Sequence, residues 1–232
     1  MAVLEQVRDD PSVRALVLSG SPGAFCAGGN LHFLKEQLDA GPAYWQQRLQ
    51  PGLRLVNDLL RLTRPLIAVL DGPAFGAGFA LALTADIVLA SPQARFAMSY
   101  LKLGLVPDLG PMCLLPRVVG LQRAKELMFS AREVDADEAQ RLGIVMEVHA
   151  SDSIETRARQ IAPSLTLAAP TAIGLTKAAL NMSLDSDQQG MFAIEASSQA
   201  AAFASPELRQ AIEAMLAKQA PAYRGFPRPK AP

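Results

Sequence analysis

Short apolar runs alternate with helical runs along the first two thirds of the chain, and helical runs alone fill the last third. Apolar runs that are rich in branched side chains and bounded by turn residues indicate buried strands. Apolar residues at a spacing of three and four indicate helices. The pattern predicts strands at 13–18, 65–70, 86–90 and 144–148. It predicts helices at 2–9, 42–61, 76–84, 120–130, 135–142, 152–168, 170–183, 188–203 and 205–217.

This order of elements is typical of an α/β fold followed by a helical region. A chain of 232 residues can bury a sizeable core as one domain with a helical appendage. We therefore expect a core over residues 1–165 and a C-terminal helical region and tail over 166–232. The sequence contains neither a Gly/Ser linker nor a repeat that would indicate a further division.

Charge and cysteine content narrow the class of protein. Lys and Arg together number 22, as do Asp and Glu, so nothing draws the whole chain toward nucleic acid or an anionic membrane. Cys26 and Cys113 are too few for a disulfide framework, which suits a reducing compartment. The longest apolar stretch, 73–85, is shorter than the ~20 residues that cross a bilayer. We expect a cytoplasmic protein without a membrane or nucleic-acid partner.

The most informative segment is 71–90, DGPAFGAGFALALTADIVLA. A turn pair leads through Gly76, Ala77 and Gly78 into an apolar helix. Small residues at a helix start let a ligand approach backbone N–H groups that have no partner inside the helix. These groups lie at the positive end of the helix dipole and favour a negatively charged oxygen. The same pattern also serves close helix packing, so this segment alone leaves both interpretations open.

A second glycine-rich loop follows the first predicted strand. The turn cluster 19–23 leads into AFCAGGNL at 24–31. A strand that ends in such a loop is another place where backbone N–H groups face a ligand. Two N–H donors from two separate loops would form an oxyanion hole, which stabilises charge as it develops on a carbonyl oxygen.

These motifs together resemble the crotonase (enoyl-CoA hydratase/isomerase) family. The resemblance rests on 24–31 and 71–90 and continues through Gly104–Asp108, LPRVVG at 115–120 and AQRLGIV at 139–145. It implies a spiral of ββα units with C-terminal helices that form a homotrimer or a dimer of trimers. It also implies an acyl-CoA substrate and no cofactor other than the coenzyme A of that substrate. The oxyanion-hole donors would be the N–H groups of Gly29 and Ala77.

Hydratases of this family use two glutamates to position and deprotonate water. In this chain the two matching positions hold Ala80 and Tyr100. Alanine takes up no proton, and a phenol with a pKa of about 10 is a poor base at neutral pH. Ordinary hydration is therefore not the expected reaction.

One carboxylate lies where several isomerases of the family carry their catalytic acid. Asp108 matches that position, and a single carboxylate can take a proton from C2 of a 3-enoyl thioester and return one at C4. We expect the apolar neighbours Leu105, Val106, Leu109 and Met112 to shield it from water. Taken without the resemblance, an Asp after Pro107 is more often only a turn residue or a helix cap than a catalytic group. The family's dehalogenase branch places a nucleophilic aspartate here.

The resemblance implies further substrate-binding positions around these groups and across a subunit interface. Phe203 and Lys218 resemble C-terminal residues that hold coenzyme A from a neighbouring subunit, although packing or simple exposure explains them equally well. No His, Cys or Asp cluster has the spacing of metal ligands, so we expect no metal. The expected substrate-binding residues are Ala27, Asn30, Leu31, Gly76, Ala80, Tyr100, Leu105, Phe203 and Lys218.

Three functions remain open from the sequence. The preferred one is an acyl-CoA isomerase in which Asp108 carries the proton. The second is another acyl-CoA enzyme of the same scaffold, either a hydratase with different groups or an Asp108-dependent hydrolase. The third is a non-catalytic acyl-CoA-binding or assembly subunit. Relatives also carry strands ahead of the point that matches Met1, so we expect the first strands of the family, which help to bind coenzyme A, to be missing here.

Overall fold

A parallel sheet forms the centre of the computed structural model, which describes residues 2–183 and 185–227. Its strands are β1 (Leu16–Ser19), β2 (Leu66–Leu70), β4 (Ile87–Ala90) and β7 (Glu147–Val148), in the order β1-β2-β4-β7. All neighbouring strands run parallel. Every residue of β2 is buried, as expected for a central strand that is covered on both faces.

A second, smaller sheet lies beside the first. It contains β3 (Pro73–Phe75), β5 (Arg95–Ala97) and β6 (Val134–Asp135) in the order β3-β5-β6. The apolar core packs around both sheets, and the rings of Phe79 and Phe96 meet edge to face at 5.3 Å between centroids. This contact joins the helix after β3 to β5 and so fixes the start of that helix, where the candidate site lies.

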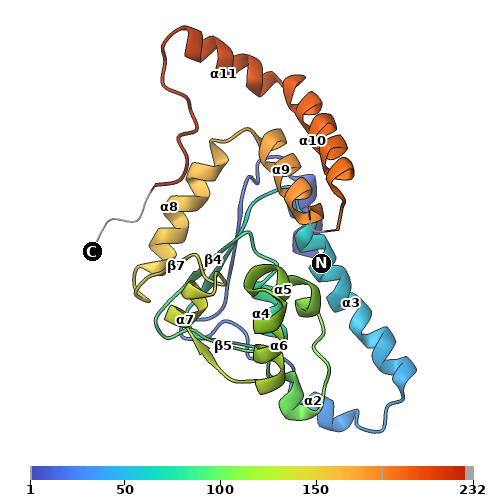
Figure 1. The fold of residues 1–232 in the computed structure, drawn as a ribbon. Coiled ribbons are helices and arrows are strands. Elements are labelled where there is room, and N and C mark those ends of the chain that lie inside the picture. The colour runs from blue at the N-terminus through green and yellow to red at the C-terminus, as the bar shows by residue number, and fades with distance from the viewer. Residues whose placement is uncertain (1, 184, 228–232) are drawn as a thin grey trace.

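Helices cover the sheets and continue beyond them (Figure 1). They are α1 (Ala2–Asp9), α2 (Leu31–Glu36), α3 (Pro42–Leu60), α4 (Ala77–Ala82), the 3₁₀ helix η1 (Ser99–Leu103), α5 (Pro111–Val119), α6 (Leu121–Ser130), α7 (Ala136–Arg141), α8 (Ile154–Thr166), α9 (Pro170–Met182), α10 (Gln188–Phe203) and α11 (Pro206–Leu216). Among the described residues, no helix is both long enough and apolar enough to cross a membrane.

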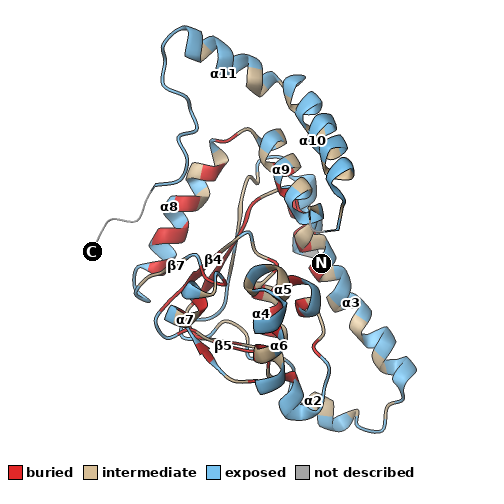
Figure 2. Cartoon of the chain, in the orientation of Figure 1, coloured by how far each residue is buried: buried red, intermediate tan, exposed pale blue. Residues whose placement is uncertain are grey.

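The last two helices extend away from the core. Figure 1 shows α10 and α11 at the opposite end of the molecule from α2, and Figure 2 shows that their surfaces are mostly exposed. Neither α10 nor α11 contains a buried residue. By contrast, Ile154 and Ile161 of α8 are fully buried against β2 and β4. The C-terminal helices therefore carry apolar side chains that one chain alone does not cover.

The predicted helices of ten or more residues agree with the structure to within two residues at each end. The strand expected at 144–148 is instead confined to Glu147–Val148. The strand expected at 13–18 instead spans Leu16–Ser19, because β1 pairs residue by residue with β2, which starts after Pro65. The sequence analysis missed β3, β5, β6, α2, α5 and η1, of which the strands have two or three residues. Residues 1, 184 and 228–232 of the two expected regions lie outside the described part of the chain.

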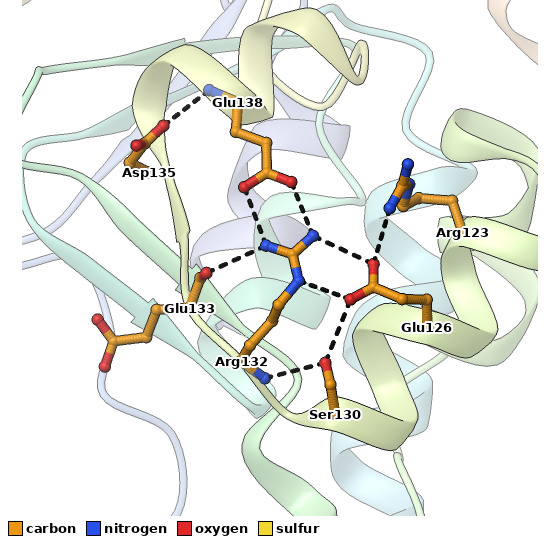
Figure 3. A network of polar contacts seen from close by, with 7 residues as sticks. All are labelled: Arg123, Glu126, Ser130, Arg132, Glu133, Asp135 and Glu138. Carbon is orange, nitrogen blue, oxygen red and sulfur yellow. Dashed lines mark hydrogen bonds and ion pairs between the residues drawn. The ribbon is translucent and has the colours of Figure 1, made fainter.

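An arginine-centred network ties α6, β6 and α7 together (Figure 3). The guanidinium of Arg132 donates to both carboxylate oxygens of Glu126, at 2.6 and 3.1 Å, and to both oxygens of Glu138, at 2.7 and 2.9 Å. Hydrogen bonds from Arg132 lower the pKa of Glu126 to about 2 and also lower the pKa of Glu138. The network holds β6 against β5, and β5 in turn pairs with β3.

We predict that Arg132→Met lowers the melting temperature at pH 7, because the variant leaves Glu126 and Glu138 side by side without their shared cation. A folded-state pKa below the unfolded value stabilises the fold at high pH, and that contribution is lost as pH falls through the folded value. The deficit of the variant should therefore shrink between pH 4.5 and about pH 2. Thermal unfolding at both pH values measures this.

Arg159→Met is the matched control, because Arg159 is 81 % exposed and lies 3.8 Å from Glu155. Exposed pairs of this kind contribute little, so its melting temperature should follow that of the wild type at both pH values. An Arg132→Met deficit of the same size at pH 2 and pH 7 would show that the arginine stabilises the fold through packing rather than charge.

Candidate active site

The two glycine-rich loops lie side by side. The Cys26 N–H donates to the Pro73 carbonyl at 3.0 Å, and the Phe75 N–H donates to the Cys26 carbonyl at 2.9 Å. Cys26 and Ala74 form a parallel bridge, so the first loop adds one strand-like position to the edge of β3. The sequence predicts that the two loops contribute to one oxyanion hole, and in the structure they are hydrogen-bonded neighbours.

Glycines allow this close approach. A Cβ atom on Gly78 would overlap the backbone carbonyl of Cys26. Gly28 has a φ of +94°, and a Cβ atom there would lie 2.8 Å from the Phe75 carbonyl oxygen and 3.7 Å from the Ala77 nitrogen. Positive φ angles and close backbone contact both favour glycine. Gly28, the residue before Gly29, therefore lies directly beside Ala77.

Both expected oxyanion donors lack an internal partner. Ala77 is the first residue of α4, so its N–H cannot bond within the helix. Gly29 lies just before Asn30, whose side chain accepts hydrogen bonds from the N–H groups of His32 and Phe33 at the start of α2. Among the hydrogen bonds of residues 2–183 and 185–227, neither the Gly29 nor the Ala77 N–H donates. Both amides are therefore available to a ligand oxygen.

In the structure, as in the sequence, the two positions that match the family's glutamates provide no carboxylate. Ala80 lies in α4 and is fully buried. Tyr100 lies in η1 with 8 % of its surface exposed, and its hydroxyl donates to the main-chain carbonyl of Asp108 at 3.1 Å. Burial, followed by the negative charge of Asp108, raises the pKa of Tyr100 well above its ordinary value. The phenol therefore stays protonated at neutral pH and acts as a donor.

Asp108 sits on a turn that is packed against α3. It is half-buried and follows the buried Pro107. The next two residues, Leu109 and Gly110, have φ angles of 65° and 90°. The side chain of Leu109 fills the space over Gly52, since a Cβ atom on Gly52 would lie 2.5 Å from its Cδ2. The contact with α3 and the hydrogen bond from Tyr100 fix the backbone that carries the Asp108 carboxylate.

The expected apolar shield around Asp108 is not formed within one chain. Leu105 is 44 % exposed, Val106 70 % and Met112 57 %. Gly104 ends η1 in a left-handed conformation, after which the chain runs along the surface as far as Pro107. These three side chains are therefore largely exposed, and the expectation that they desolvate Asp108 is wrong for the single chain. Of the four expected neighbours, only Leu109 is half-buried, and it packs against α3.

The remaining expected site residues divide into two groups. Ala27, Asn30, Leu31 and Gly76 lie in or beside the two loops, and Leu105 lies near Asp108 in the chain. Phe203, which is 65 % exposed, ends α10, and Lys218 follows α11, so neither is near the loops in this chain (Figure 1). Within the described residues, no group of three or more His, Cys, Asp or Glu could hold a metal ion.

The sequence does not predict a side-chain hydrogen bond that fixes the turn before the second loop. The carboxylate of Asp71 accepts a hydrogen bond from the Ser151 hydroxyl at 2.6 Å, and this bond lowers the pKa of Asp71. The sequence indicates only a turn at Asp71, and Ser151 lies 80 positions further along the chain. Neither residue carries a sequence signal for the other. The contact fixes the turn between β2 and β3, from which the Ala77 donor follows.

Two glycine-rich loops beside a parallel α/β core thus present unpaired backbone amides, the kind of donors that stabilise negative charge on a carbonyl oxygen. The family model described as enoyl-CoA hydratase/isomerase matches residues 1–226. The chain therefore belongs to the enoyl-CoA hydratase/isomerase family, has the crotonase fold, and its family members are enzymes that act on CoA thioesters.

Individual relatives include both an isomerase and a hydratase. The 1,2-epoxyphenylacetyl-CoA isomerase of Escherichia coli K12 is 35 % identical over 228 residues, covering 96 % of this chain and 85 % of the relative. The short-chain-enoyl-CoA hydratase of Clostridium acetobutylicum is 31 % identical over 94 % of this chain and 82 % of its own. A crystal structure of an enoyl-CoA hydratase/isomerase from Cupriavidus metallidurans CH34 is 68 % identical, with a TM-score of 0.95 over 99 % of this chain and 86 % of that one.

Proposed function

We propose that this protein is an enoyl-CoA isomerase that shifts the double bond of a 3-enoyl-CoA to the 2-position. The observation that carries the proposal is that Asp108 provides a carboxylate on a fixed turn while the two hydratase positions hold Ala80 and Tyr100. An isomerisation needs one group that takes up and returns a proton. Hydration needs carboxylates that also position water.

The proposed reaction uses three groups of the chain. The Asp108 carboxylate removes the proton from C2, and the electron pair of that C–H bond moves into the thioester to form a dienolate. The N–H groups of Gly29 and Ala77 hold the oxygen that gains negative charge. Protonated Asp108 then returns the proton at C4, while the double bond forms between C2 and C3. The reaction consumes no water and leaves Asp108 in its starting state.

The alternative hydration has less support from this site. Ala80 offers no polar atom, and the Tyr100 phenol remains protonated because burial and the charge of Asp108 oppose its ionisation. A neutral phenol that already donates to the Asp108 carbonyl cannot take a proton from water. The C. acetobutylicum relative, by its name, is a hydratase, so the assay must measure both reactions.

The test is to follow a 3-enoyl-CoA and a 2-enoyl-CoA by the absorbance of the conjugated thioester. Isomerisation raises this absorbance from the first substrate, whereas hydration lowers it from the second. We expect the first reaction to be faster by a wide margin. Faster loss of the 2-enoyl-CoA would contradict the proposal, and release of free CoA would favour the Asp108-dependent hydrolase.

We further propose that the chain assembles as a homotrimer or a dimer of trimers through residues 166–232. The support is that α10 and α11 expose large apolar side chains, among them Phe192 at 57 %, Phe203 at 65 % and Leu216 at 80 %. Covering such surface is favourable by about 25 cal/mol per Å². In this assembly, Phe203 and Lys218 would reach the CoA of a neighbouring subunit. The cytoplasm is the location that we propose, since it keeps the free Cys26 and Cys113 reduced.

We predict that light scattering during gel filtration gives a mass of three or six chains. Leu216→Glu places a charge on the exposed apolar face of α11 and should shift the mass toward a single chain, because burying an unpaired charge is unfavourable. Lys125→Glu, on the core helix α6, is the control and should leave the mass unchanged. A wild-type mass of one chain would contradict this part of the proposal.

A further inference from the structure

Tyr100 contacts the chain around Asp108 at two points. Its main-chain carbonyl accepts a hydrogen bond from the Leu105 N–H at 3.0 Å. Its hydroxyl donates to the main-chain carbonyl of Asp108 at 3.1 Å. One residue therefore holds both ends of the segment 105–108, in which Pro107 has no N–H of its own to donate.

The same side chain also lies against the oxyanion-hole loop. A Cβ atom on Gly76 would lie 3.8 Å from both Cε2 and Cζ of the Tyr100 ring. Gly76 is the N-cap of α4, immediately before the Ala77 donor. The ring thus packs on the backbone that carries one oxyanion donor, while the hydroxyl at its far end holds the backbone that carries the carboxylate.

We propose that Tyr100 is a positioning residue that sets the distance between the Asp108 carboxylate and the oxyanion hole. This inference rests on the proposed isomerase function. The residue is 8 % exposed, so its ring has little freedom to move. Burial and the nearby Asp108 charge also raise the pKa of Tyr100, which keeps the hydroxyl protonated and able to donate at neutral pH. Tyr100 occupies a position where hydratases of the family carry a glutamate, and here it would serve a reaction that needs no water.

The first test is Tyr100→Phe, which keeps the ring and removes the hydroxyl. Misplacement of a catalytic group by about 1 Å can cost about 10²-fold in rate, so we expect kcat to fall by about 10- to 100-fold. KM and the Kd of a saturated acyl-CoA should stay within about twofold, because neither the amides nor the ring is removed. Tyr44→Phe, which removes a phenol hydroxyl from a partly exposed position at the start of α3, is the matched control and should leave kcat unchanged.

A double-mutant cycle separates positioning from an independent role. If Tyr100 acts through Asp108, the double variant Tyr100→Phe/Asp108→Asn should lose no more activity than Asp108→Asn alone. Additive losses would overturn the inference, as would a Tyr100→Phe effect confined to KM. Tyr100→Met keeps a long apolar side chain without a donor and replaces the phenylalanine variant in the cycle if that variant does not fold.

Exchange of the C2 protons of a saturated acyl-CoA with deuterium from D₂O distinguishes this inference from the proposed function itself. The exchange needs the base and the oxyanion hole but no double bond. If the wild type neither exchanges C2 protons nor isomerises a 3-enoyl-CoA, the proposed function fails. If the wild type does both and Tyr100→Phe matches it in both, the function stands and the positioning role of Tyr100 is wrong.

Discussion

Asp108→Asn should lower the rate of double-bond isomerisation by about 10²- to 10⁴-fold, the usual contribution of a general acid–base group. The amide has nearly the same shape as the carboxylate but cannot take up the C2 proton. The backbone of residue 108 still accepts the hydrogen bond from Tyr100, so the turn should keep its structure. Stopped-flow or steady-state absorbance of the conjugated product measures the loss, and the Kd of a saturated acyl-CoA should hardly change.

Asp152→Asn is the matched control, since it makes the same exchange at an exposed position in the loop before α8. It should keep full activity. Each result for Asp108→Asn discriminates among the functions that the sequence leaves open. Retained isomerisation would remove Asp108 from the mechanism. A wild type and a variant that both bind acyl-CoA without turnover would instead support a binding subunit.

The sequence predicted the parts of the fold in which local pattern and tertiary structure agree. The run 65–70 is apolar throughout because β2 is buried on both faces, so its place in the sheet could be inferred. Helices 120–130 and 135–142 were found within one residue of their bounds. The short strands β3 and β5 could not be predicted, because three residues carry no measurable period and their pairing comes from distant parts of the chain.

The candidate site could likewise be predicted only in part. The glycine motifs identified both amide-bearing loops, because positive φ and close approach leave few alternatives to glycine. The hydrogen bond from Tyr100 to the Asp108 carbonyl has no such signature, since any residue offers a carbonyl. The expected burial of Asp108 by apolar side chains was wrong because the sequence does not show how the backbone orients them. Hydrophobic character places a side chain inside only when the backbone turns it inward, and Val106 is 70 % exposed.

Gly28→Ala should lower kcat by about 10²- to 10³-fold, the usual cost of losing one oxyanion donor. The new methyl group would lie 2.8 Å from the Phe75 carbonyl oxygen, which belongs to the backbone and cannot rotate away. The loop that carries Gly29 must therefore move away from Ala77, and the two N–H groups no longer meet one oxygen. The strained φ of +94° should also destabilise the fold by about 1–3 kcal/mol.

Gly23→Ala separates the displaced donor from backbone strain, because Gly23 lies on the same loop with a φ of +75° but has no atom within 4 Å of its Cβ position. Its stability should fall by about 1 kcal/mol for the left-handed conformation alone, with most of the activity retained. Urea unfolding and kcat of both variants give the comparison. Equal losses of activity in the two would show that loop stability, rather than the position of the Gly29 amide, limits the reaction. A loss of activity confined to Gly28→Ala would support the Gly29 amide as an oxyanion donor, because only that variant meets the Phe75 carbonyl, whereas both variants place a side chain at a positive φ.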